Sequence, residues 1–195
     1  MPGFDDFVPG EIPAASKLND MLMKQVVGQY ASDAARDSAL SGNLRDGMYA
    51  TTLDNDRLYR YNGSAWVVIS EPAQAWTPVI TQGVTVTATN NFSWYQRSNG
   101  VFTAQCNLSI TGAGTAANTI IVVPPFTLAD ANGAMGSFFI YDASSTLVYA
   151  GTAASSSTTA ITLYTDQGGL NGVGNSPGLT LAASDTLKAS FQGRY

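Results

Sequence analysis

Four aspartates in the C-terminal part of the sequence are the side chains best able to do chemistry, because the chain has no histidine and only one cysteine. Two suitably spaced carboxylates can hydrolyse a glycosidic bond. Asp130, Asp142, Asp166 and Asp185 each lie in or beside a predicted turn, where aspartate usually accepts hydrogen bonds from nearby backbone. We therefore expect no catalytic residue and no enzyme, and keep a polysaccharide-cleaving enzyme only as a remote alternative.

The sequence lacks the residues that bind metals and cofactors in proteins. Without histidine, Ser-His-Asp and Cys-His arrangements and histidine-ligated metals are excluded. Cys106 alone cannot hold zinc, and on the apolar face of a predicted strand it is expected to be a small buried hydrophobe. Asp54-Asn55-Asp56 lacks the further oxygen ligands of a calcium loop and is expected to form a turn. The sequence predicts no metal site and no cofactor.

Aromatic side chains of the C-terminal part could instead bind a ligand. Aromatic rings can stack on sugars, while Asn and Thr side chains can hydrogen-bond to sugar hydroxyls. The alternative, which we favour, is that these rings fill the core or an interface between copies of the chain. The candidate glycan-contact residues are Trp94, Tyr95, Tyr141, Tyr149 and Tyr164.

The charge of the chain excludes several classes of partner. The formal net charge is −5, and Lys and Arg form no cluster. Binding to nucleic-acid phosphates or to an anionic membrane surface requires such a cluster. The longest apolar run, Ile120 to Phe126, is too short to span a bilayer, and no secretory signal is visible. We expect no nucleic acid, no membrane insertion and assembly in a cytoplasm.

Composition changes near Glu71-Pro72, where we predict a domain boundary. Residues 1–71 have ten acidic and six basic side chains, whereas residues 72–195 have four and three, with thirteen of the nineteen glycines. Low charge and frequent turns are typical of an all-β domain. We predict an N-terminal arm with helices over 1–43, a small β-meander over 44–71 and an antiparallel, jelly-roll-like β-sandwich over 72–195.

The N-terminal segment is expected to attach the chain to something else. Residues 2–13 combine prolines with apolar side chains, which indicates an extended arm that docks either on its own domain or, as we favour, on a partner. A helix is predicted from about Ala14 to Tyr30, with an apolar stripe that could pack on its own domain or on copies of itself. A second helix is predicted from Asp33 to Leu40 behind the N-cap Ser32. The candidate attachment and oligomerisation residues are Phe4, Phe7, Ile12, Leu18, Met21, Leu22 and Val26.

Two strand patterns dominate the rest of the chain. Residues 48–69 predict three strands joined by Asp54-Asn55-Asp56 and by Asn62-Gly63, a strong hairpin signal. From Trp76 onward about eight strands follow, with turn signals that include Asn90-Asn91 and Ser98-Asn99-Gly100. These strands are predicted over Thr77–Thr89, Phe92–Arg97, Val101–Thr111, Thr119–Val123, Gly136–Tyr141, Leu147–Ala150, Thr158–Tyr164 and Asp185–Arg194.

The segment from Phe92 to Pro125 is expected to form the central hairpin. Phe102 to Ile110 alternates apolar and polar residues, as a strand with one buried face does. The unbroken β-branched run that follows predicts a strand buried on both faces, one against the core and the other against a neighbouring subunit. The candidate subunit-interface or core residues are Ile120, Ile121, Val122, Val123 and Tyr195.

Two motifs resemble those of bacteriophage virion fibre and minor tail proteins. LRDGMYATTLDNDRLYRYNGSAWVVI resembles the D-x-x-x-L-Y-x-Y-x-G-S-x-W hairpin of phage fibres. The second motif consists of W-T-P, then W-Y-x-R-x-N-G-V, the alternating strand, G-x-G, V-V-P-P and a final F-x-G-x-Y. This layout as a whole is similar to terminal β-sandwiches of the tumour-necrosis-factor or C1q type. Together the two motifs cover roughly residues 44–195.

The resemblance implies a homotrimeric structural protein of the virion, without cofactors. Its N-terminal part would attach to other virion proteins, and its C-terminal domain would be exposed and could contact a host cell-surface glycan. The absence of a heptad stalk favours a short knob over a long fibre. Attachment to the tail is favoured over the capsid, with a capsid decoration protein or head fibre as the alternative.

Overall fold

The computed structural model describes residues 27–131, 134–165, 172–175 and 178–195. The chain divides into two compact units, residues 1–69 and 70–195, which we describe separately. The predicted arm, most of the first predicted helix and Asp166 lie outside the described residues, together with all seven candidate attachment residues.

The first unit is a small sheet with one short helix. Its elements are β1 (Gly28–Tyr30), α2 (Asp33–Leu40), β2 (Tyr49–Thr52), β3 (Arg57–Tyr61) and β4 (Trp66–Ser70), and the strand order is β1-β2-β3-β4. The predicted meander of β2, β3 and β4 is confirmed. The helix predicted as far as Tyr30 is wrong at its end, because Gly28–Tyr30 pairs in parallel with β2. Gly28 is a poor helix former, and the pairing provides backbone partners that a helix end lacks.

Helix α2 forms as its sequence predicts. The Ser32 hydroxyl accepts a hydrogen bond from the Ala35 amide at 3.2 Å, and Gly42 after the helix has a φ of +78°. The helix also buries Arg36, which the sequence did not indicate. The Arg36 guanidinium lies 4.5 Å from the Tyr59 ring centroid and 4.7 Å from that of Trp66. These cation–π contacts hold the helix against one face of the sheet.

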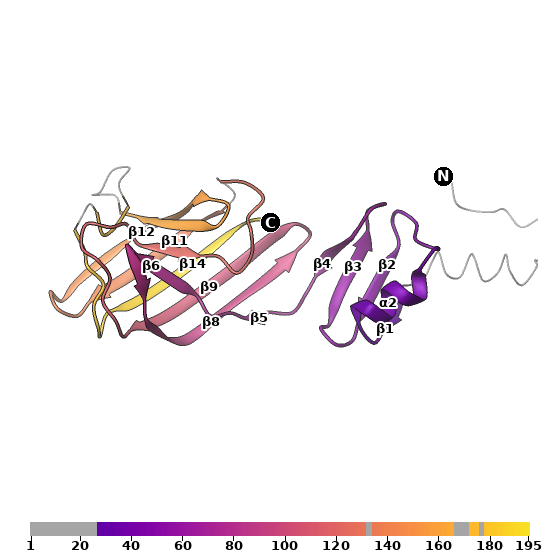
Figure 1. The fold of residues 1–195 in the computed structure, drawn as a ribbon, viewed down its shortest axis with the longest axis horizontal. Helices are drawn as coiled ribbons and strands as arrows, with labels where there is room; N and C mark the ends of the chain where they lie inside the picture. Colours follow the sequence, from indigo (N-terminus) through magenta and orange to yellow (C-terminus); the bar gives the residue numbers. More distant parts are fainter. Residues whose placement is uncertain (1–26, 132–133, 166–171, 176–177) are drawn as a thin grey trace, which may run out of the picture. The chain divides into compact units, whose positions relative to one another are not determined.

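The second unit is a ten-stranded antiparallel sheet, which confirms a mainly β chain (Figure 1). The strand order is β5-β8-β9-β14-β11-β12-β13-β10-β6-β7. The strands are β5 (Gln74–Ala75), β6 (Val79–Gln82), β7 (Val84–Val86), β8 (Ala88–Ser98), β9 (Val101–Ile110), β10 (Ile121–Val123), β11 (Ala134–Asp142), β12 (Leu147–Ser157), β13 (Ala160–Tyr164) and β14 (Thr186–Arg194).

The chain path forces this sheet to curl. Strand β7 lies at one edge of the sheet and β8 next to the other edge, yet only Thr87 separates them in sequence. The Cα atoms of Val86 and Ala88 can therefore be no more than about 7.6 Å apart. The curl of one continuous sheet closes the core, so that buried residues of β6 and β10 join those of β9 and β14 in a single cluster.

The alternation predicted for Phe102 to Ile110 is confirmed in β9, but the β8–β9 hairpin lies second and third from one edge of the sheet and not at its centre. The inward side chains of β9 are at most 1% exposed, and they are Phe102, Ala104, Cys106, Leu108 and Ile110. Burial raises the pKa of the Cys106 thiol to about 12. The β8–β9 hairpin turns at Asn99 and Gly100, whose φ angles of 49° and 79° suit a type I′ turn.

Three local predictions differ from the structure. Asn90-Asn91 is not a turn, because β8 continues through it with an irregular register between Asn90 and Phe92. The strand predicted over Thr77–Thr89 is broken at Gly83, where a φ of +73° lets the chain reverse between β6 and β7. In the run Ile120–Val123, alternate residues are fully buried and half-buried, so only one face of β10 meets the core.

Candidate functional site: the outer face of the curled sheet

Five strands of the second unit share an outward surface that we call the outer face. It consists of the outward side chains of β8, β9, β14, β11 and β12, which alternate with the core residues. Cross-strand pairing places Gln105, Ser190 and Ser137 in one row. The next row on one side is Asn107, Lys188 and Phe139, and the row on the other side is Thr103, Gln192 and Met135.

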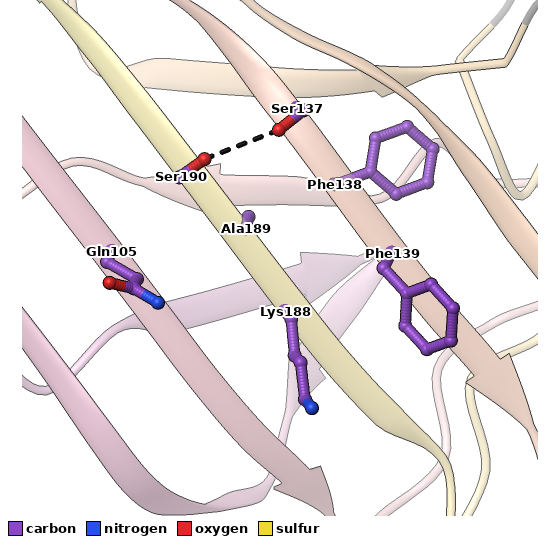
Figure 2. Close-up of a pocket in the computed structure, with 7 residues that line it drawn as sticks. All are labelled: Gln105, Ser137, Phe138, Phe139, Lys188, Ala189 and Ser190. Atoms are coloured by element: carbon purple, nitrogen blue, oxygen red, sulfur yellow. Dashed lines mark hydrogen bonds between the residues drawn. The ribbon is translucent and has the colours of Figure 1, made fainter.

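Two adjoining depressions lie on this outer face and share Ser137 and Ser190. One has a volume of about 180 Å³ and includes Gln105, Phe139 and Lys188 in its lining. The other has a volume of about 240 Å³ and includes Thr103, Met135 and Gln192. Figure 2 shows the first, with Lys188 on β14 between Gln105 of β9 and Phe139 of β11. The depressions form because short serine side chains stand between longer ones.

The charges of the outer face are few and of one sign. Among its outward positions only Lys188 and Arg194 are charged, and both belong to β14. Lys188 forms no ion pair with any of the residues that the structure describes. The face therefore combines hydroxyl and amide groups, exposed rings and an available ammonium group, although the whole chain has a net charge of −5.

The five aromatic residues predicted to contact a glycan do not form one site. Tyr95 and Tyr149 pack against the core on the inner face. Trp94 and Tyr164 lie at opposite ends of a row that crosses six strands, which are spaced about 4.8 Å apart. Tyr141 lies outward near the end of β11 and is 37% exposed. The rings that flank the depressions are instead Phe139 and, one strand beyond Asn107, Phe92.

The residues that line the depressions were not predicted from the sequence. The alternation of β9 and β14 already indicated that Gln105 and Lys188 point away from the core. Lys188 is also the one lysine of residues 72–195, which is the signal that could have drawn attention to it. What the sequence could not give is the strand order that brings β9, β14 and β11 together.

The candidate subunit-interface residues divide between the core and the surface. Ile120 and Val122 are fully buried in the core. Ile121 and Val123 are half-buried on the outward side of β10, where Val123 pairs with Val79 of β6. Tyr195 packs against the core beside Phe126, with ring centroids 5.4 Å apart.

Asp142 is engaged in the turn between β11 and β12. Its carboxylate accepts hydrogen bonds from the amides of Ser144 and Ser145, at 2.9 and 3.2 Å, and from both of their hydroxyls at 2.7 Å. These bonds, led by the Ser144 hydroxyl, lower the pKa of Asp142 below its usual value. Asp185, which is fully buried, accepts from the amides of Ala143 and Ala182. Both carboxylates therefore stabilise turns.

Replacing Asp142 with asparagine is expected to cost about 1–2 kcal/mol of unfolding free energy at neutral pH, because an amide oxygen accepts these bonds less strongly. Since folding lowers the pKa, the carboxylate stabilises the fold above pH of about 4 and loses this effect as the pH falls further. In urea unfolding, the difference in unfolding free energy between the wild type and Asp142→Asn should therefore become smaller as the pH falls below about 4. A difference that does not change with pH would contradict the role of the Asp142 carboxylate in stabilising this turn.

Neither a metal centre nor a membrane span is found in the part of the chain that the structure describes. There, no three His, Cys, Asp or Glu side chains are grouped so as to hold a metal ion. No described helix is long and apolar enough to cross a bilayer. Compared with known proteins, the chain matches no family model, no curated protein and no solved structure.

Proposed function

We propose that this chain is a structural component of a bacteriophage particle, a short trimeric tail fibre or minor tail protein. Its N-terminal part would attach to other virion proteins, and its second unit would be exposed and able to contact the host surface. The resemblance of the two sequence motifs to phage fibres supports this proposal. In the structure the first motif folds as a hairpin, in which Tyr61 and Trp66 pack edge to face across the Asn62-Gly63 turn with ring centroids 5.4 Å apart.

The observation that carries the proposal is an apolar patch on β10 and β6. Its residues are Val79, Ile121 and Val123, which point outward beside Thr81 and have no charged neighbour among the outward residues of these two strands. Val79 is 45% exposed. Apolar area that stays in water is unfavourable by about 25 cal/mol per Å², and sister copies would cover it. We call Val79, Ile121 and Val123 the β10 patch.

The full chain is expected to be a trimer by light scattering, and Val79→Asp is expected to make it a folded monomer. A carboxylate placed in an apolar interface loses its water without gaining a partner, whereas on the exposed surface of a monomer it costs little. Val148→Asp is the matched control, because Val148 is 55% exposed on β12 and lies outside the β10 patch. Circular dichroism checks that each variant folds. A monomeric wild-type chain would contradict the proposal.

Location in the particle distinguishes the two candidate attachments. An antibody against residues 70–195 should label the tail in micrographs of assembled particles. Labelling distributed over the capsid would support the alternative of a decoration protein or head fibre, and no labelling of particles would contradict both. The polysaccharide-cleaving alternative is not favoured, because a general acid in glycoside hydrolysis needs a raised pKa and that of Asp142 is lowered.

A further inference from the structure

We propose that the two depressions around Ser137 and Ser190 bind an acidic sugar, with Lys188 recognising its carboxylate. The proposal deepens the host-surface contact of the proposed function and rests on it for its biological setting. The proposed site is not the set of aromatic residues that the sequence indicated. Its residues are brought together by the strand order of the sheet, which the sequence did not show.

The shape of the surface suits a ligand that lies across it. The depressions join at Ser137 and Ser190, whose hydroxyl oxygens are 3.3 Å apart. Each is smaller than the roughly 300–1,000 Å³ of a pocket that encloses a small molecule. Together they form a shallow trough along β14 and β11 that is bordered by Phe139 and Met135. A chain of two or three sugar rings can lie in such a trough with one ring in each depression.

The polar groups of the trough match the hydroxyls of a sugar. Ser137 and Ser190 can both donate and accept on the floor (Figure 2). Gln105, Thr103 and Gln192 line the β9 and β14 side, and each amide offers a donor and an acceptor at fixed spacing. Phe139, which is 39% exposed, presents a ring that the apolar face of a sugar can cover.

The charge of the trough selects an acidic ligand. Lys188 lies opposite Phe139 on one side and Asn107 on the other, and no carboxylate stands among the outward positions of the face. A cation without a counterion on a surface that lacks acids attracts anions, and a carboxylate can accept a charge-assisted hydrogen bond from its ammonium group.

A second copy of the chain fits this surface less well. The exposed rings would favour self-association, but a copy seated here would have to cover Lys188 and Arg194. Both charges would then lose water, and no carboxylate on their own face would neutralise them. The apolar β10 patch, which carries no charge, is the better site for sister copies.

Titration of the isotope-labelled full chain with a trimer of galacturonic acid tests the proposal, with the methyl ester of the same trimer as the neutral control. We expect amide shifts centred on Ser137, Lys188 and Ser190, and affinity for the acid about five- to tenfold above that for the ester. Lys188→Gln should lower the affinity for the acid to that for the ester, and Lys188→Arg should keep the preference for the acid. Ser137→Trp, which fills the trough, should abolish binding of both.

Several results would overturn the proposal. These are equal affinity for acid and ester, an unchanged preference in Lys188→Gln, shifts centred on another surface, or no shift with either sugar at millimolar concentration. A Phe139→Asp variant that dissociates the trimer would show that the face is covered by a second copy instead. A trimeric chain that binds no acidic sugar refutes this inference alone. A monomeric chain that binds it refutes the proposed trimeric function and leaves the site intact.

Discussion

Replacing Glu71 with alanine is expected to lower the unfolding free energy of the second unit by about 3 kcal/mol, the lower end of what breaking a buried ion pair costs. The Glu71 side chain is fully buried, and its carboxylate accepts two hydrogen bonds from Arg97. The Arg97 Nε–Glu71 Oε1 distance is 2.7 Å, and the Nη2–Oε2 distance is 2.9 Å. The lower end applies because the Arg97 side chain is 20% exposed, so water can solvate part of its charge.

The unfolding free energy falls because Arg97 is left without the Glu71 carboxylate. The hydrogen bond to Glu71 raises the pKa of Arg97 above its usual value. Without Glu71 this effect is lost, but the guanidinium stays charged because arginine keeps its proton at any ordinary pH. The guanidinium also lies 5.3 Å from the Tyr195 ring centroid and 5.9 Å from that of Phe126. An arginine that turns toward water would leave the rings that close this end of the core.

Chemical unfolding of three variants separates these contributions. The double variant Glu71→Ala with Arg97→Ala should be less destabilised than the sum of the single changes, because no lone charge then remains. Arg60→Ala is the exposed control. Arg60 and Asp46 are 3.4 Å apart with both side chains largely exposed, and the change should cost less than about 1 kcal/mol. Additive effects of the two single changes would contradict a coupled pair.

Replacing Gln82 with leucine is expected to cost about 2–4 kcal/mol, because it leaves several buried backbone groups without partners. Gln82 is fully buried on β6. Its amide nitrogen donates to the carbonyls of Leu179, at 2.5 Å, and Asn118, at 3.2 Å. Its side-chain oxygen accepts from the Leu181 amide at 2.9 Å. One side chain thus satisfies backbone from two loops.

Neighbouring glycines show how closely these loops surround Gln82. A Cβ atom on Gly114 would collide with the Gln82 side-chain oxygen, and one on Gly174 would collide with its amide nitrogen. Leucine, which is branched and cannot hydrogen-bond, therefore loses the bonds and also strains the packing. The matched control is Gln105→Leu on the exposed side of β9, which should stay within about 0.5 kcal/mol of the wild type. Equal effects of the two changes in urea unfolding would contradict this role.

Local physics explains what could be predicted. The alternation from Phe102 to Ile110 predicted β9 because a strand sends successive side chains to opposite faces. Ser32 predicted the start of α2, and Asn99-Gly100 predicted the tight turn after β8, because these residues satisfy or adopt a backbone geometry within a few positions. Asn90-Asn91 was mistaken for a turn because a strand can absorb an irregular residue without reversing.

The candidate site was beyond local reasoning. Gln105, Lys188 and Ser137 lie on three strands that are adjacent in the sheet but far apart in the sequence. The aromatic residues chosen from the sequence are instead divided between the core and distant parts of the outer face. Residue type indicated which side chains could contact a sugar, but not which of them share a surface.

The sequence alone determined the mainly β character of this protein, several of its turns and the inward faces of β9 and β14, since period-two alternation and turn residues act over a few positions. The tertiary structure decided the strand order, the burial of Gln82 and the pairing of Glu71 with Arg97, 26 residues away. These depend on which strands meet. That choice is made by the free energy of the whole core, because any strand of suitable length can offer the same backbone hydrogen bonds to several partners.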